Sequence, residues 1–128
     1  MLFSGNLQAT ANLKLKCAGI NTSLFEATGS LFGAFGSDHG DRSELVRIAK
    51  NRYAELIGRA EIEPNDMVII GDSPKDISCA HDNGVPCVAV TTGRYARDQL
   101  SDADLVLDGG FKDLEKSIEA IVKTRRTV

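Results

Sequence analysis

The sequence contains no apolar run that approaches the length of a membrane-spanning helix, so we expect no membrane partner. Its first residues, Met1-Leu2-Phe3, lack the basic region of a signal peptide. The formal net charge is -3, and the basic cluster Lys123, Arg125 and Arg126 is typical of a solvated helix end. A nucleic-acid-binding domain normally carries a basic patch or stripe, so we expect no nucleic-acid partner either.

Cysteine is scarce and is not arranged in pairs. The three cysteines are odd in number and form no C-x-x-C motif, which disfavours a disulfide framework or a zinc site. We expect Cys17 and Cys79 on apolar faces of helices and Cys87 in a strand, all three as small buried hydrophobic residues. Unpaired thiols of this kind favour a reducing, cytoplasmic location.

The composition is that of an ordinary globular protein. The chain has 128 residues, of which 42% are hydrophobic and 26% are charged. This length fits a single domain over residues 1–128 and is sufficient to bury a useful core.

Apolar residues alternate between short runs and helical spacing along the chain. The short runs predict strands at 1–3, 31–35, 67–70, 86–90 and 104–107, and helical spacing predicts helices at 7–18, 42–57, 75–83, 94–100 and 111–122. Strands that alternate with helices predict an α/β fold, a parallel sheet with helices on both faces and right-handed crossovers.

Two of the predicted helices have a clear apolar face. Helical spacing predicts that these residues face the core: Leu45, Ile48, Ala49, Tyr53 and Leu56 in the second helix, and Leu114, Ile118 and Ile121 in the last.

The most informative segment is Val68-Ile69-Ile70-Gly71-Asp72-Ser73-Pro74-Lys75-Asp76. β-Branched residues predict a strand buried on both faces, Gly71 allows a sharp turn, and Pro74 suits the first turn of a helix. Asp72 and Asp76 then lie at the carboxyl end of the strand, where open α/β sheets bind ligands. Two carboxylates there predict a Mg²⁺ site. The alternative is that Asp72 closes a turn and Asp76 favours the helix N-terminus.

Ser4 precedes the first predicted helix and is followed by Gly5 and Asn6. Free N–H groups at a helix start, approached closely by a short polar segment, can bind an anion such as phosphate. The alternative is that Ser4 only caps the helix.

Three segments together resemble the haloacid dehalogenase-like (HAD) hydrolases, in particular phosphoglycolate-phosphatase-like members. They are Phe3-Ser4-Gly5-Asn6, Gly71-Asp72-Ser73-Pro74-Lys75-Asp76 and Val90-Thr91-Thr92-Gly93-Arg94-Tyr95, in the order and spacing of that family. The resemblance extends over essentially the whole chain and implies a Rossmann-like core. It implies that the Ser4 hydroxyl binds the phosphoryl group and that Asp72 coordinates Mg²⁺. Asp76 would be a second ligand or would orient a bound water.

The third motif of the family is a basic residue at the start of a helix. Arg42 is the best-placed match, although the usual Lys-Pro pattern does not occur. Arg47 and Lys50 are more typical of a solvated helix face. Asp38 and His39 lie in the same loop as Arg42 and could line the site, whereas His81 is expected to be structural or exposed.

The first motif of the family, Asp-x-Asp after the first strand, has no counterpart before Ser4. Asp102-Ala103-Asp104 has the letters but precedes a strand. We therefore expect residues 1–128 to be the C-terminal part of a HAD-like core that lacks its first central strand and its cap. The covalent route would be closed in this chain alone. The open sheet edges would favour self-association or pairing with a missing N-terminal segment.

The expected function is that of a Mg²⁺-dependent phosphomonoester hydrolase acting on a small phosphorylated substrate, with this chain inactive by itself. Ser4, Arg42 and the metal would hold the phosphoryl group. The alternative is a non-catalytic phosphate- or metal-binding domain, or an interaction domain, derived from the same fold. A dehalogenase is less favoured, because that reaction does not need the metal that Asp72 and Asp76 predict.

Overall fold

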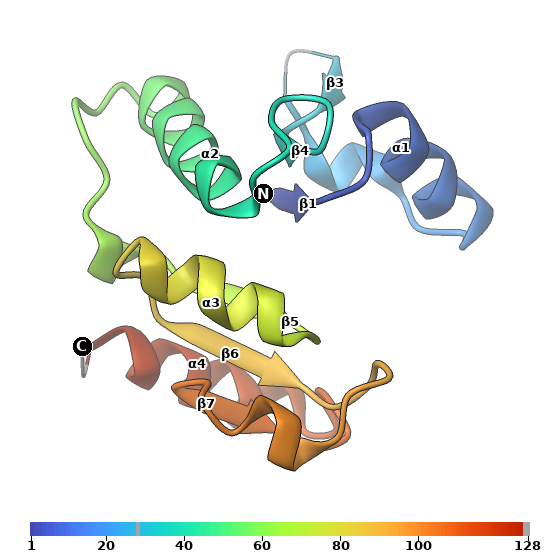
Figure 1. Ribbon diagram of the computed structural model, residues 1–128. Helices are drawn as coiled ribbons and strands as arrows, with labels where there is room; N and C mark the ends of the chain where they lie inside the picture. Colours follow the sequence, from blue (N-terminus) through green and yellow to red (C-terminus); the bar gives the residue numbers. More distant parts are fainter. Residues whose placement is uncertain (28, 127–128) are drawn as a thin grey trace. The chain divides into compact units, whose positions relative to one another are not determined.

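The computed structural model describes residues 1–27 and 29–126 (Figure 1). The chain divides into two compact units, Met1–Glu61 (unit 1) and Ile62–Val128 (unit 2). Each unit contains its own parallel sheet, and each is described by itself below. The prediction that residues 1–128 make up one domain stays a prediction.

Unit 1 is built around two short parallel strands. Its elements are β1 (Leu2–Ser4), α1 (Gln8–Cys17), the 3₁₀ turn η1 (Thr22–Phe25), β2 (Glu26–Ala27), β3 (Ser30–Leu31), β4 (Gly33–Phe35) and α2 (Arg42–Leu56). Strand β1 pairs with β4 in parallel, with Ser4 opposite Phe35. Strands β2 and β3 form a small antiparallel pair, so the single strand predicted at 31–35 is divided between β3 and β4.

The two faces of the β1–β4 sheet carry two separate apolar clusters. Phe35 packs with Ala11 of α1 and Leu31. Its neighbour Ala34 packs with Leu45 and Ala49 of α2. Successive strand residues point to opposite faces, so α1 covers one face of this sheet and α2 covers the other.

Helix α2 begins and ends as the sequence predicts. The Asp41 side chain accepts a hydrogen bond from Ser43 N at 2.9 Å and caps the N-terminus, and Gly58 follows the end of the helix with a φ of 68°. The predicted core face is wrong in its C-terminal half, because Tyr53 and Leu56 are exposed. The 15-residue helix is about 22 Å long and extends beyond the three-residue strands that it covers, so its C-terminal residues are not packed on the sheet.

Unit 2 is a three-stranded parallel sheet with the order β5-β6-β7. Its elements are η2 (Pro64–Asp66), β5 (Ile69–Gly71), α3 (Pro74–Asp82), β6 (Cys87–Val90), η3 (Arg97–Leu100), β7 (Leu105–Leu107) and α4 (Leu114–Arg126). Figure 1 shows α3 in front of this sheet and α4 behind it. The predicted α/β class with parallel strands is confirmed, and the helix predicted at 94–100 is reduced to the 3₁₀ turn η3.

Burial differs between the central and the outer strand of this sheet. Every residue of β6 is buried, as expected for a strand covered on both faces. Among the described residues, strand β5 pairs with β6 alone, and Ile70 is 46% exposed although Ile69 is buried. The prediction of a strand buried on both faces therefore holds for Ile69 and is wrong for Ile70, because β5 lies at the edge of its sheet.

Helix α4 buries small polar residues in place of the predicted apolar ones. Leu114 and Ile118 are exposed, which contradicts the inward position predicted for them, and Ile121 is half-buried, whereas Ser117 and Thr124 are buried. The Ser117 hydroxyl donates to Asp113 O and the Thr124 hydroxyl to Ala120 O, at 2.7 and 2.9 Å. Both hydroxyls are satisfied inside the helix, so they can be buried without an unpaired polar group.

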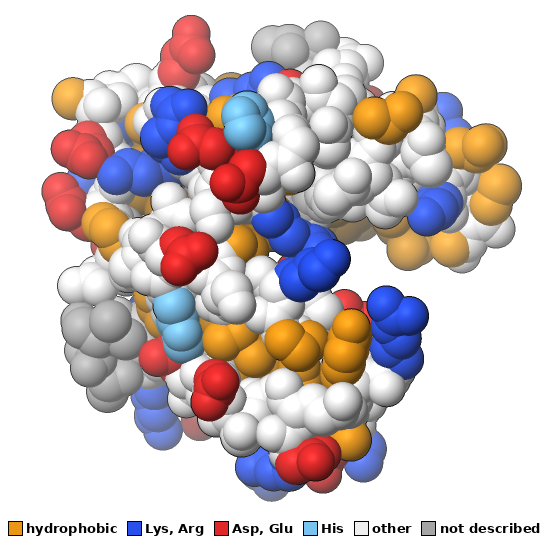
Figure 2. Space-filling model, viewed as in Figure 1, with side chains coloured by type: hydrophobic (Ala, Val, Ile, Leu, Met, Phe, Trp, Pro, Cys, Tyr) orange, Lys and Arg blue, Asp and Glu red, His pale blue; other side chains and the backbone are white. Residues whose placement is uncertain are grey.

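The three cysteines differ in burial. Cys79 and Cys87 are buried as predicted, but Cys17, at the end of α1, is exposed, because α1 buries only Ala11. Figure 2 shows hydrophobic side chains on the surface over α1, where Leu13 is among the exposed residues. None of the helices in the described part of the chain is long and apolar enough to cross a membrane.

Candidate functional site

Asp72 lies directly after β5, at the carboxyl end of the unit 2 sheet. Its side chain is exposed, and among the described residues its carboxylate accepts no hydrogen bond and forms no ion pair. Gly93, in the loop after β6, lies directly against this carboxylate. A side chain would not fit at this position, since its Cβ would overlap Asp72 Oδ2. The sequence did not predict that Gly93 lies close to Asp72. In the sequence, Thr92-Gly93-Arg94 was only part of a segment that resembles the family.

Asp76 organises the turn that carries Asp72. Its Oδ2 accepts hydrogen bonds from Ser73 Oγ at 2.8 Å, Ser73 N at 3.1 Å and Asp72 N at 3.2 Å. Ser73 in turn caps α3, so the two side chains form a capping box. Asp76 is buried, and a Cβ on Gly71 would overlap its carboxyl group. The helix N-terminal role that the sequence left open for Asp76 is therefore observed, and the pattern Ser73-x-x-Asp76 was the signal for it.

Asp72 and Asp76 are the two carboxylates of this turn that could hold Mg²⁺. In the described ranges, no three His, Cys, Asp or Glu side chains are grouped to hold a metal. Mg²⁺ needs no such group, because it usually takes one or two carboxylates and completes its shell with waters and phosphate oxygens. The exposed Asp72 carboxylate suits the role of first ligand. Asp76 already accepts three hydrogen bonds, which makes it the second of the two candidates.

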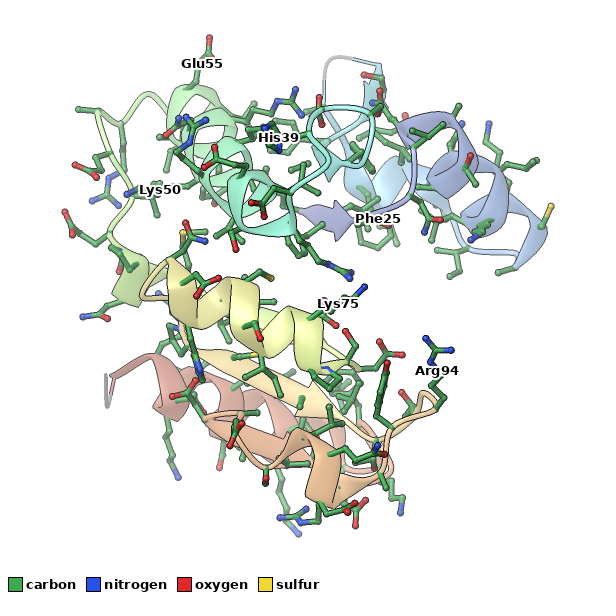
Figure 3. All side chains as sticks on the ribbon, viewed as in Figure 1. Phe25, His39, Lys50, Glu55, Lys75 and Arg94 are labelled. Atoms are coloured by element: carbon green, nitrogen blue, oxygen red, sulfur yellow. The ribbon has the colours of Figure 1, made fainter. Side chains whose placement is uncertain are left out.

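Other polar groups gather at the same end of unit 2. Thr91 Oγ1 donates to Asp108 Oδ1 at 2.6 Å and accepts from Gly109 N at 2.6 Å, which ties the loop after β6 to the loop after β7. Figure 3 shows Lys75 and Arg94 extending from this end, where β5 leads into α3 and β6 into its loop. Both side chains are exposed.

Ser4 ends β1 in unit 1 and turns its hydroxyl towards the chain that follows. Ser4 Oγ accepts from Asn6 N and from Asn6 Nδ2, both at 3.1 Å. The alternative that Ser4 caps α1 is wrong, because the N-cap residue is Leu7 and the first helical N–H, that of Gln8, donates to Ser37 Oγ at 3.2 Å. Ser4 and Asn6 instead form a local turn at the end of β1.

Asn6 and Gly5 sit between β1 and the loop after β4. Gly36 N donates to Asn6 O at 2.8 Å, and a Cβ on Gly36 would overlap Gly5 O. The Asn6 side chain also accepts from Lys14 Nζ at 3.1 Å. A Cβ on Gly5 itself would meet no atom within 4 Å, so Gly5 leaves the Ser4 turn open on that side.

Arg42 is the first residue of α2, and it packs on β1. Its Cζ lies 5.8 Å from the centre of the Phe3 ring, which is a cation–π distance. Phe3 immediately precedes Ser4, so the structure brings the start of α2 beside the strand that ends in Ser4.

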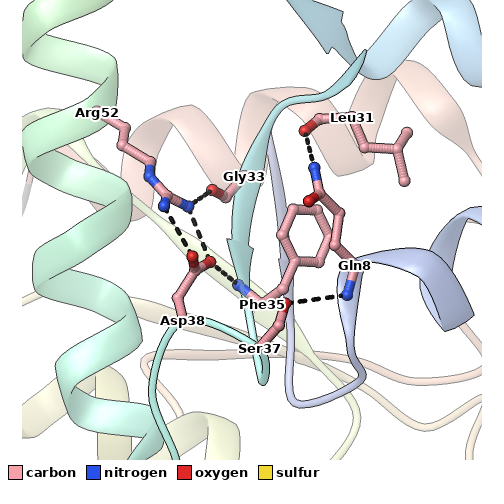
Figure 4. A network of polar contacts seen from close by, with 7 residues as sticks. All are labelled: Gln8, Leu31, Gly33, Phe35, Ser37, Asp38 and Arg52. Atoms are coloured by element: carbon pink, nitrogen blue, oxygen red, sulfur yellow. Dashed lines mark hydrogen bonds and ion pairs between the residues drawn. The ribbon is translucent and has the colours of Figure 1, made fainter.

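Asp38 has a structural partner that the sequence did not reveal. Arg52 forms a two-pronged ion pair with it, with Nη2 to Oδ1 at 2.7 Å and Nη1 to Oδ2 at 2.8 Å (Figure 4). Arg52 Nη1 also donates to Gly33 O at 2.7 Å, and Phe35 N donates to Asp38 Oδ2 at 2.9 Å. The Arg52 hydrogen bond holds the pKa of Asp38 below its usual value. These hydrogen bonds hold the loop after β4 against α2. Asp38 and Arg52 also line a cavity of about 470 Å³.

His39 and His81 make local contacts. His39 Nδ1 accepts from Asp41 N at 2.9 Å, next to the cap of α2. His81 Nε2 lies 2.9 Å from Asp104 Oδ2, and the same oxygen accepts from Cys87 N at 2.8 Å. Asp104 thus fixes the start of β6, and burial raises the pKa of the neighbouring Cys87 thiol to about 12.

The comparisons with known proteins point to one family. A family model described as HAD-hydrolase-like matches residues 42–116, which is more than half of the chain. The matched range contains Arg42, Asp72 and Asp76, whereas Ser4 lies outside it. No curated protein gives a significant match.

Proposed function

Because the chain belongs to the HAD-hydrolase-like family, we propose that it forms the metal- and phosphate-binding part of a Mg²⁺-dependent phosphomonoester hydrolase. The observation that carries this proposal is the Asp72 carboxylate. It is exposed at the carboxyl end of a parallel strand, where α/β sheets bind ligands, and its turn is held in place by Asp76. We also propose that the chain is a phosphoglycolate-phosphatase-like member of this family, because residues 90–95 resemble the corresponding loop of those members.

In this proposal Asp72 holds Mg²⁺ directly, and Asp76 is a second ligand or orients a bound water. When bound, the metal would neutralise negative charge on the phosphoryl oxygens. The hydrogen bonds from Asp72 N and Ser73 to Asp76 fix the backbone that carries Asp72. A preset backbone lowers the cost of ordering the site when a ligand binds.

Ser4 and Arg42 are the phosphate-binding residues that we assign from unit 1. The Ser4 hydroxyl accepts from Asn6, and its own proton is available to a phosphoryl oxygen. Gly5 and Asn6 are the other two phosphate-binding residues of the proposal, and the Asn6 N–H, which donates to Ser4 Oγ, orients that hydroxyl. The Arg42 guanidinium, stacked on Phe3, supplies positive charge and a fork of N–H donors that matches a phosphate.

The attacking aspartate is not assigned to this chain. Its sequence has no Asp-x-Asp after a strand, and Asp104 is committed to His81 and to the start of β6. We propose that the aspartate comes from another polypeptide segment that pairs with an open edge of β1 or β5. Each of these strands has a partner on one side only in the described part of the chain. The substrate would be a small phosphorylated molecule.

We place the protein in the cytoplasm. All three thiols are free, which suits a reducing compartment. A second candidate function is a non-catalytic metal- or phosphate-binding domain. It is favoured by the same lack of an Asp-x-Asp after a strand in this sequence, and it predicts binding without turnover even after a complementing segment is added.

Mg²⁺ titration by calorimetry, combined with a p-nitrophenyl phosphate assay, tests these alternatives. Asp72→Asn should abolish Mg²⁺ binding, whereas the control Asp102→Asn, at an exposed acid of unit 2, should leave it unchanged. Unchanged Mg²⁺ binding in Asp72→Asn would refute the metal assignment. Turnover by the 128-residue chain alone that Asp102→Asn or Asp104→Asn abolishes would place the nucleophile in the segment that we have excluded.

A further inference from the structure

Helix α4 exposes its apolar face to solvent. Leu114, Ile118 and Val122 follow one another at intervals of four residues, so they share one face of the helix. Their exposed fractions lie between 38% and 63%, and Phe111, just before the helix, is exposed too. A surface helix normally turns such a face to the core of its own domain. A row of exposed apolar side chains on one helix face, unlike single scattered ones, marks an interaction surface.

The opposite side of α4 is already used for packing inside unit 2. The helix packs on β7, behind the sheet in Figure 1. Its buried residues are small, Ser117 and Thr124, and both hydroxyls are satisfied by carbonyls of the helix. A rotation that turned Leu114 and Ile118 inward would bring larger side chains to the positions of these small ones, which overpacks the contact. The apolar face is therefore left for a partner.

A row of charges beside this face indicates which partner fits. Glu115, Glu119 and Lys123 lie four residues apart along α4, and all three are exposed. Neither acid forms a hydrogen bond or ion pair with another described residue. Two copies of α4 in parallel would bring like charges level at all three positions. In an antiparallel pair centred on Glu119, Glu115 of each copy lies level with Lys123 of the other, so two opposite-charge pairs form against one like-charge pair.

We propose that the chain forms a homodimer in which the apolar faces of two α4 helices pack antiparallel about a two-fold axis. This inference does not depend on the proposed function. A two-fold contact uses the same face on both copies, so it closes at the dimer. The 13-residue helix is about 20 Å long. One such helix pair buries less than the roughly 800 Å² per partner of a standard interface, so we expect a weak dimer with a dissociation constant of about 10–100 µM.

Sedimentation velocity of the full chain, from about 5 to about 500 µM, brackets this constant and measures it. Ile118→Glu places two carboxylates near the centre of the contact and should weaken the dimer at least about tenfold. The matched control Leu13→Glu changes an exposed leucine of α1 in unit 1 and should leave the constant unchanged. Circular dichroism checks that each variant is folded, as expected for substitutions at exposed positions.

A charge exchange tests the direction of the two helices. Lys123→Glu should weaken the dimer about fivefold, because each Glu115 then meets an acid. Adding Glu115→Lys to this variant should restore the affinity of an antiparallel dimer, since both pairs form again with their signs reversed. A double variant as weak as Lys123→Glu alone would overturn the antiparallel arrangement.

Two outcomes would overturn the dimer itself. One is a wild-type chain that stays monomeric at every concentration. The other is self-association that Ile118→Glu does not weaken, which would place the contact elsewhere, for example at the open edges of β1 or β5. Because these measurements need no Mg²⁺ and no phosphate ligand, either outcome leaves the proposed function untouched.

Discussion

The two units treat an acid at the end of a parallel strand in opposite ways. In unit 1, Asp38 follows β4 and is held by a two-pronged ion pair with Arg52 and by Phe35 N. In unit 2, Asp72 follows β5, and its carboxylate has no partner among the described residues. Both acids lie where α/β sheets commonly bind ligands. The comparison teaches that position alone does not identify a metal ligand, because a carboxylate must also be left available by its neighbours.

The largest expected effect tests whether each unit has a core of its own. Leu45 in unit 1 is 1% exposed and Leu100 in unit 2 is 0% exposed, so replacing either with alanine should cost about 2–5 kcal/mol. Fluorine NMR of fluorotyrosine-labelled protein in urea can follow Tyr53 in unit 1 and Tyr95 in unit 2. Leu45→Ala should lower the midpoint more at Tyr53, and Leu100→Ala more at Tyr95. Equal shifts at both tyrosines in both variants would mean that the units unfold as one.

The reactivity of the thiols should also differ between the two units. Burial raises the pKa of Cys87 to about 12, so at pH 8 only about one molecule in ten thousand carries its thiolate. Cys79 is also buried, whereas Cys17 of unit 1 is exposed. Iodoacetamide should therefore modify Cys17 at least about a hundredfold faster than Cys87 in the native protein. Mass spectrometry of peptides from a time course measures the rates, and comparable rates at the two sites would contradict the burial of Cys87.

One added methyl group at Gly93 should displace the Asp72 carboxylate and leave unit 1 unchanged. Gly93→Ala puts a Cβ where the Asp72 carboxylate lies, so the carboxylate must move, and we expect Mg²⁺ affinity to fall about tenfold. Gly40→Ala is the matched control, because a Cβ there meets no atom within 4 Å. Calorimetric titration with Mg²⁺ measures both. Unaltered affinity in Gly93→Ala would show that the position of Asp72 against this loop does not matter for the metal.

The smallest effect concerns the pH dependence of the Asp38–Arg52 pair. The Arg52 hydrogen bond lowers the pKa of Asp38 below the ordinary 3.8. The stability that this pair contributes is therefore present above pH 3.8 and is lost as the pH falls through the lower native pKa. Arg52 is partly exposed, so Asp38→Asn should cost only about 1 kcal/mol at pH 7, and this cost should shrink as the pH falls through the native pKa of Asp38.

Urea unfolding across this pH range, followed by circular dichroism, measures the difference. Asp98→Asn, at an exposed acid in unit 2, serves as the control and should leave the pH profile unchanged. A cost of Asp38→Asn that does not vary with pH would show that the carboxylate acts through packing and not through its charge.

Local signals in the sequence predicted most of the elements. The cap residue Asp41, the glycine after α2 and Pro74 at the first turn of α3 mark helix ends through local backbone chemistry, and those ends are found close to their predicted places. The short apolar run Cys87–Val90 was likewise enough to predict the buried strand β6.

Residue pairs that lie far apart in the sequence were not predictable. No local pattern distinguishes Arg52 from the other charged residues of its helix, and its pairing with Asp38 exists only because β4 packs beside α2. The burial of Ser117 and Thr124 in place of Leu114 and Ile118 could not be predicted from helical spacing either. Helical spacing shows which residues share a face, but the neighbouring elements decide which face is covered.

The sequence by itself determined that this protein is an α/β hydrolase-like chain with an acid pair after an apolar strand, because strand, turn and cap preferences act over a few residues. The tertiary structure alone decided that Asp76 is tied into the turn while Asp72 is left exposed against Gly93. It also decided that the other strand-end acid, Asp38, is taken up by Arg52. The availability of a carboxylate depends on which groups the fold brings within hydrogen-bond distance, and most of those groups come from other elements.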